Sequence, residues 1–225
     1  MNVGAPGGLT DAGDLRLRNS GDKASEDFAE IRRAVAALLS QDERPVSLGG
    51  DHSITYPILQ AFAARYPEIT IIHVDAHPDL YDEFEGSRLS HACPFARIME
   101  EGLAQRLVQI GIRTINAHQR EQATRFGVEV IEMSALPAYD RLRIAGPVYV
   151  SFDVDVLDPA FAPGVSHREP GGMTTREAIA HLHAIQGNIV GADIVEYNPA
   201  QDVSGVTATV AAKILKEILG KMHLK

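Results

Sequence analysis

Apolar and polar positions along this chain of 225 residues form two kinds of segment. Short runs of β-branched and apolar residues are typical of buried strands in a parallel sheet, and longer segments repeat their apolar residues every three or four positions, as amphipathic helices do. The pattern predicts strands at 45–48, 69–75, 107–112, 128–131, 147–156 and 188–195, with a further short strand near residues 14–15. It predicts helices at 24–39, 53–65, 94–101, 119–125, 174–185 and 205–219.

Strands and helices therefore alternate along the chain, which is the pattern of a parallel sheet covered by helices on both faces. Neither an internal repeat nor a low-complexity linker interrupts the sequence. We expect one domain over residues 1–225, folded as a three-layer α/β/α structure with a mostly parallel sheet. Ligands of such sheets bind outside the carboxyl ends of the strands. The functional site is thus expected after residues 48, 75 and 153.

The composition excludes several classes of function. A formal net charge of −9 argues against nucleic acid or an anionic membrane as partner, while 45% hydrophobic residues suffice for a sizeable core. Cys93 is the only cysteine, which rules out a disulfide framework within the chain and fits a reducing compartment. No apolar run approaches the roughly 18 residues that span a bilayer, and residues 1–19 lack the apolar core of a signal peptide. We expect a cytoplasmic protein.

Two imidazoles and four carboxylates stand where three of the predicted strands end, and they are His52, Asp75, His77, Asp79, Asp153 and Asp155. Side chains two positions apart on an extended segment point the same way, so each group that follows a strand faces one side. Buried carboxylates are very costly unless a cation lies between them. Oxygen and imidazole ligands without thiolate suit manganese, nickel, cobalt or iron better than a structural zinc. Two such ions can activate water for hydrolysis, which predicts a binuclear hydrolase without saying which bond is cut.

Five short segments occur in order between residues 45 and 218. They read GGDHS at 49–53, DAHPD at 75–79, SHACPF at 90–95, SFDVDVLDP at 151–159 and DIVEYNP at 193–199. Together they resemble the ureohydrolases, the family of arginase and agmatinase, and are nearest to its plant-type branch. The resemblance implies an arginase-like fold, two Mn²⁺ ions per chain, and hydrolysis of a small cationic guanidino compound to urea and an amine.

The resemblance also implies how the metal ligands are shared. One manganese ion would be bound by His52, Asp75, Asp79 and Asp153. The other would be bound by His77, Asp75, Asp153 and Asp155. Asp75 and Asp153 would therefore bridge the two ions, and Asp79 would also hold the proton of the bridging hydroxide.

Further roles follow for residues outside the ligand set. The resemblance implies that Glu196 accepts hydrogen bonds from the substrate guanidinium and that His91 donates a proton to the leaving amine. His167 lies in a loop, residues 163–172, that the family places at the site mouth, and is a candidate substrate contact. Cys93, two positions from His91, is the alternative nucleophile. His73 is expected to be a hydrogen-bonded core histidine or a support for a metal ligand.

The segment after DAHPD bears on the choice of substrate. Arginases of the animal and bacillus type continue with an Asn- and Ser-rich stretch that reads the α-amino and α-carboxylate groups, whereas this chain continues LYDEFEGSRL at 80–89. This difference favours a substrate without an amino-acid head. Agmatine, cleaved to putrescine and urea, is therefore the favoured substrate, with L-arginine, cleaved to ornithine and urea, or another guanidino compound as the alternative.

The opening of the chain departs from the family pattern. Family members carry a further strand and a Gly-rich segment before GGDH, whereas only residues 1–48 precede that motif here. We therefore expect an N-terminally short ureohydrolase domain with one altered sheet edge. Because an unpaired edge readily pairs with another chain, we expect this edge to be buried in a homo-oligomer, a trimer or hexamer.

Two other classes of protein compete with this interpretation. Metal-dependent deacetylases share the sheet architecture, but they use one zinc ion and paired catalytic histidines, which the sequence lacks. A non-catalytic relative, acting as a metal-dependent binding or oligomerisation subunit, is the second alternative.

Overall fold

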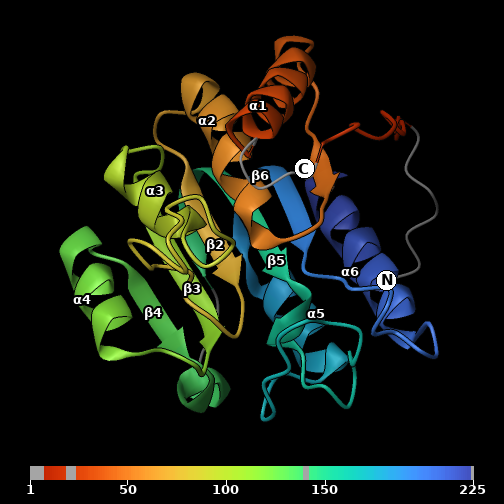
Figure 1. Ribbon diagram of the computed structural model, residues 1–225. Coiled ribbons are helices and arrows are strands. Elements are labelled where there is room, and N and C mark those ends of the chain that lie inside the picture. Colours follow the sequence, from red (N-terminus) through yellow and green to blue (C-terminus); the bar gives the residue numbers. More distant parts are fainter. Residues whose placement is uncertain (1–7, 19–23, 139–141, 224–225) are drawn as a thin grey trace.

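The computed structural model describes residues 8–18, 24–138 and 142–223. These residues form a six-stranded sheet with the order β1-β6-β5-β2-β3-β4 (Figure 1). The strands are β1 (Val46–Leu48), β2 (Thr70–Val74), β3 (Arg106–Ile112), β4 (Glu129–Glu132), β5 (Arg143–Asp153) and β6 (Gln186–Val195). All pairings are parallel, so the predicted parallel sheet is confirmed.

Helices cover both faces of the sheet. They are α1 (Ala24–Ser40), α2 (Thr55–Arg65), α3 (Pro94–Glu100), α4 (Ala117–Phe126), α5 (Thr175–Ala184) and α6 (Val206–His223). Helices α1 to α4 pack on one face, and α5 and α6 pack on the other (Figure 1). The predicted three-layer α/β/α arrangement is therefore confirmed.

Alternation of side chains along the strands supplies the two cores. On β2, Ile71 belongs to the core under α1–α4 and its neighbour Ile72 belongs to the core under α5 and α6. Both side chains are fully buried, because both faces of the sheet are covered. Each such isoleucine contributes about 1.5–3 kcal/mol to the free energy of folding. The apolar runs of the central strands thus follow directly from their position in the sheet.

Several predicted elements differ from the structure. The strand expected at 147–156 is observed as β5 at Arg143–Asp153, because residues 154–156 form a 3-10 turn, and α6 ends at His223 and not at residue 219. The strand expected near residues 14–15 is wrong: residues 9–18 have no regular secondary structure, and the side chains of Asp14 and Leu15 are exposed. The helix expected from Ser53 begins as a 3-10 turn at His52–Ile54, and the α-helix α2 starts only at Thr55. Strand β6 begins at Gln186, two residues earlier than predicted, because Gln186 pairs with Arg143 of β5.

The carboxyl ends of β1, β6, β5 and β2 lie side by side in the sheet. Since all four strands run the same way, the turns that follow them meet at one edge of the sheet. These turns carry His52, Asp75, Asp155 and Glu196. Among the described residues, no helix is long and apolar enough to cross a membrane.

Candidate active site

Three carboxylates surround one imidazole nitrogen at this edge. The Nδ1 atom of His52 lies 3.2 Å from Asp75 Oδ2, 3.0 Å from Asp79 Oδ2 and 3.2 Å from Asp153 Oδ2. All four side chains are buried. Even so, Nδ1 of His52 has no hydrogen-bond partner among the described residues. A buried, unpartnered nitrogen that faces three carboxylate oxygens is an arrangement that a bound cation completes.

A second group of candidate metal ligands adjoins the first. The Nδ1 atom of His77 lies 3.1 Å from Asp155 Oδ2 and 3.6 Å from Asp75 Oδ1. Asp75 thus faces His52 with one carboxylate oxygen and His77 with the other. The structure therefore brings together all six side chains that the sequence suggested as metal ligands. Their donor set fits two divalent cations that share Asp75.

Burial and like charges shift the pKa values of these acids. Burial, together with the carboxylates of Asp155 and Asp75, raises the pKa of Asp153 well above its usual value. Burial and the charge of Asp75 raise the pKa of Asp155 to about 6. Burial alone would also raise the pKa of Asp75, but three neighbouring imidazoles hold it well below its usual range. Bound cations would take the place of protons in such a cluster.

His73 contacts Asp75, the aspartate that the two groups share. Its ring is fully buried, and its Nε2 lies 2.6 Å from Asp75 Oδ2. The side-chain amide of Gln109 donates to Nδ1 of His73 at 3.0 Å and to the carbonyl of Pro78 at 2.6 Å. Because Gln109 occupies Nδ1 as a donor, the proton of the neutral ring lies on Nε2 and points at Asp75. His73 therefore orients Asp75, a candidate metal ligand, and the strand pattern alone did not reveal this contact.

Glu196 follows β6 with a left-handed backbone, φ 65°. Its Oε1 atom accepts a hydrogen bond from the backbone N–H of His52 at 2.8 Å. Burial raises the pKa of Glu196 to about 7. Asp79 also has a positive φ, 48°. Non-glycine residues in this region cost about 1–3 kcal/mol each, and such strain concentrates at functional sites.

A cavity of about 190 Å³ lies over these groups. Seven of the residues suggested by the sequence line it, namely His77, Asp79, His91, Asp153, Asp155, His167 and Glu196. Sequence reasoning missed the other lining residues, which are Tyr81, Phe84, Ala92, Thr114 and Gln119. Two of these, Thr114 and Gln119, follow β3 at the same sheet edge. The rule that ligands bind at the carboxyl ends of strands would have found them.

Aromatic rings form one wall of the cavity. The ring centroids of Tyr81 and Phe84 lie 5.3 Å apart, and those of Phe84 and His91 lie 5.8 Å apart. His91 stacks on His167 at 5.3 Å. Burial, aided by the neighbouring imidazoles, lowers the pKa of His167, which favours its neutral form. Within the described residues, no lysine or arginine lines the cavity.

Cys93 lies outside this cavity. The side chain is fully buried and is not among the lining residues of the cavity. Burial raises the pKa of its thiol to about 11, so the nucleophilic thiolate is scarce at neutral pH. A cysteine nucleophile is therefore disfavoured.

Comparisons with known proteins give a consistent picture. The sequence model of the Arginase family matches residues 6–220. "Arginase 1, mitochondrial" of Arabidopsis thaliana is 48% identical over 95% of this chain and 66% of its own length. "Agmatinase" of Bacillus cereus is 38% identical over 93% of this chain and 73% of its own length. The solved structure of the arginase from Medicago truncatula superposes with a TM-score of 0.85 at 48% identity, covering 88% of this chain and 66% of that one. This chain thus spans about two thirds of the length of the plant relatives it matches.

Proposed function

This chain belongs to the arginase family, and we propose on this premise that it is a metal-dependent ureohydrolase that cleaves a guanidino compound to urea and an amine. One observation carries the proposal: the unpartnered Nδ1 of buried His52 faces three carboxylates in a cluster whose members line the cavity that Glu196 also lines. Membership of the arginase family also removes the deacetylase alternative.

Two divalent ions would be held by the two groups of ligands described above, with Asp75 shared between them. Manganese is the first candidate, because the donors are carboxylates and imidazoles without a thiolate. When bound, the ions would lower the pKa of a water molecule and so supply a nucleophile at neutral pH. The assignment of two Mn²⁺ ions, and of each ligand to one ion, is part of the proposal.

The remaining groups of the cavity would bind and orient the substrate. Oε1 of Glu196 is engaged by the N–H of His52, so Oε2 is the oxygen proposed to accept the guanidinium N–H. Asp79 would hold a proton of the attacking water. His91 would donate a proton to the departing amine, and its stacking on His167 would keep water from that wall of the cavity.

L-Arginine is the first candidate substrate. The plant arginase is 48% identical to this chain and the agmatinase 38%, so the preference for agmatine drawn from residues 80–89 is not supported by these identities. Agmatine stays the second candidate on a different observation. Among the described residues, no lysine or arginine lines the cavity to pair with an α-carboxylate, whereas the aromatic wall suits an apolar or cationic tail.

The test is urea release by the manganese-reconstituted chain from L-arginine, agmatine, 4-guanidinobutyrate and guanidine, each assayed separately. A chelator-treated sample and the Asp153→Asn variant serve as controls. Metal-dependent urea from one compound, absent in both controls, would support the proposal and identify the substrate. If two manganese ions bind and none of the four compounds yields urea, the non-catalytic alternative is favoured instead.

A cytoplasmic location and a homo-oligomeric state, trimer or hexamer, stay predictions. The Arabidopsis relative is designated mitochondrial, which gives the location no support. Light scattering on the purified chain would measure the mass of the assembly.

A further inference from the structure

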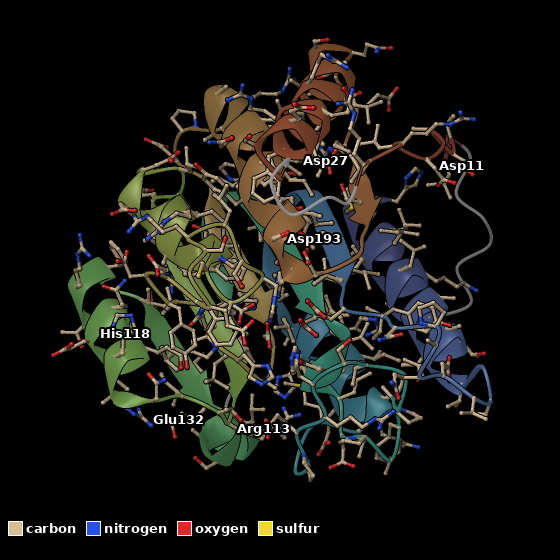
Figure 2. All side chains as sticks on the ribbon, viewed as in Figure 1. Asp11, Asp27, Arg113, His118, Glu132 and Asp193 are labelled. Carbon is tan, nitrogen blue, oxygen red and sulfur yellow. The ribbon has the colours of Figure 1, made fainter. Side chains whose placement is uncertain are left out.

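A carboxylate with no role in the proposed reaction lies directly behind the metal centre. Asp193 of β6, labelled in Figure 2, is fully buried, and its carboxylate accepts hydrogen bonds from three hydroxyl groups. Tyr149 OH and Thr55 Oγ1 donate to its Oδ2, each at 2.8 Å, and Ser151 Oγ donates to its Oδ1 at 2.7 Å. The donors come from β5 and α2.

The hydroxyl of Ser151 connects this carboxylate to His52. Ser151 Oγ lies 2.9 Å from the Nε2 atom of His52. A hydroxyl has a single proton, and that of Ser151 is donated to Asp193. The oxygen of Ser151 must therefore act as acceptor toward Nε2, which places a proton on that nitrogen. In the neutral ring, the lone pair then lies on Nδ1, the atom that faces the three carboxylates.

Given the metal centre proposed above, we infer that Asp193 is a positioning residue which, through Ser151, keeps the Nδ1 of His52 free for a divalent cation. Asp193 does not contact the cavity and is not a ligand. Its effect is to fix the direction of one hydroxyl proton. Without it, Ser151 is free to donate to Nε2, and the neutral imidazole then carries its proton on Nδ1, where it blocks metal binding.

A purely structural role for Asp193 has different consequences. If the carboxylate only joined β6 to β5 and α2, its three hydroxyl partners would be equivalent. Loss of any one would then lower the free energy of unfolding by a similar amount and would leave metal affinity unchanged. Of the three hydroxyl groups, only that of Ser151 contacts the imidazole ring of His52 as well as Asp193.

The experiment is Mn²⁺ titration by calorimetry, with thermal unfolding of each metal-free variant measured alongside. The variants of the whole chain are Asp193→Asn, Ser151→Ala, the double variant, and Tyr149→Phe as matched control. We expect Asp193→Asn and Ser151→Ala each to lower the affinity for one of the two Mn²⁺ ions by about 10–100-fold. A loss of this size is typical when the hydrogen-bond partner of a metal-binding histidine is removed. The double variant should lose no more than Ser151→Ala alone, because Asp193 acts through Ser151. Tyr149→Phe removes a hydroxyl from the same carboxylate and should change Mn²⁺ affinity less than twofold.

Losses that add in the double variant, or equal losses in Tyr149→Phe and Ser151→Ala, would overturn the inference. The comparison of Tyr149→Phe with Ser151→Ala still tests the inference if Asp193→Asn does not fold. Failure of the proposed function is distinguishable, since the unaltered chain would then release no urea from any of the four compounds. If the unaltered chain also bound no Mn²⁺, the inference would be overturned as well. If the unaltered chain binds Mn²⁺ and releases urea while all variants keep their affinity, the inference about Asp193 alone is wrong.

Discussion

The carboxylate of Glu196 accepts the backbone N–H of His52 at 2.8 Å, and this bond joins the end of β6 to the turn after β1. The residue proposed to bind the guanidinium is thereby held at a set position relative to a proposed metal ligand. The left-handed backbone of Glu196 makes this approach possible at a cost in conformational energy. The proposed substrate contact and the proposed metal ligand are thus coupled through one hydrogen bond.

Replacement Glu196→Gln should separate substrate binding from metal binding. Glutamine can still accept the N–H of His52 but no longer pairs with a cation, and loss of one partner of a buried charge pair costs about 2–5 kcal/mol. We expect kcat/KM to fall at least about 30-fold, which corresponds to about 2 kcal/mol, with Mn²⁺ stoichiometry unchanged. Steady-state kinetics and metal analysis measure the two effects. Loss of manganese together with activity would show that Glu196 acts on the metal centre instead.

The raised pKa of Glu196 predicts that the stability of the metal-free protein depends on pH, and Glu196→Gln tests this dependence. The pKa of Glu196 is raised from 4.5 to about 7, so the folded state favours the protonated form. Stability from this group is fully present below pH 4.5 and is lost as the pH rises through 7. Glu196→Gln stays neutral, so its melting temperature minus that of the unaltered protein should increase between pH 5 and pH 8. We expect a gain of about 2–4 °C for each kcal/mol, and a difference that does not vary with pH would contradict the assigned burial effect.

Asp153→Asn should abolish urea release and lower the manganese content. Asp153 Oδ2 lies 3.2 Å from Nδ1 of His52, and an amide in its place offers a neutral, weaker ligand. Asp51→Asn is the matched control: this exposed residue directly precedes His52, and its side chain contacts Ser53. Manganese content by atomic emission and urea release should change in the first variant only. A metal-replete, fully active Asp153→Asn protein would refute the assignment.

The positions of the candidate ligands at the strand ends were predictable from sequence because they depend on local rules. The apolar run before Asp75 predicts a strand, the two-residue period places Asp75 and His77 on one side, and parallel topology brings them to the edge that carries Asp153. The structure has these positions as expected. Glu196 was identified through the resemblance alone, since no periodicity signals a glutamate with φ 65°.

Residues whose environment comes from distant segments were not predictable in this way. Asp193 receives its hydroxyl partners from Thr55, Tyr149 and Ser151, and no local pattern brings these together. The aromatic wall depends on the path of residues 80–91, which has no regular secondary structure from which to derive positions. The wrong strand near Asp14 and Leu15 shows the converse error, because a short segment forms a strand only if another strand is available to pair with it.

Gly111 on β3 provides a test of how the strand that neighbours β2 constrains the proposed metal centre. Its φ is +98°, and a Cβ there would lie 2.7 Å from Cγ2 of Val156 and 3.1 Å from the carbonyl oxygen of Asp75. Gly111→Ala therefore combines backbone strain with a clash against the segments that carry two proposed ligands. We expect a loss of about 2–4 kcal/mol in the free energy of unfolding, measured by urea denaturation, and weaker Mn²⁺ binding.

Gly102→Ala is the control, because its φ is +63° but no atom lies within 4 Å of the added Cβ. The control should lose about 1 kcal/mol from backbone strain and keep its Mn²⁺ affinity. Equal losses of stability in the two variants would mean that the backbone conformation alone, and not the contact with Val156 and Asp75, requires glycine at this position.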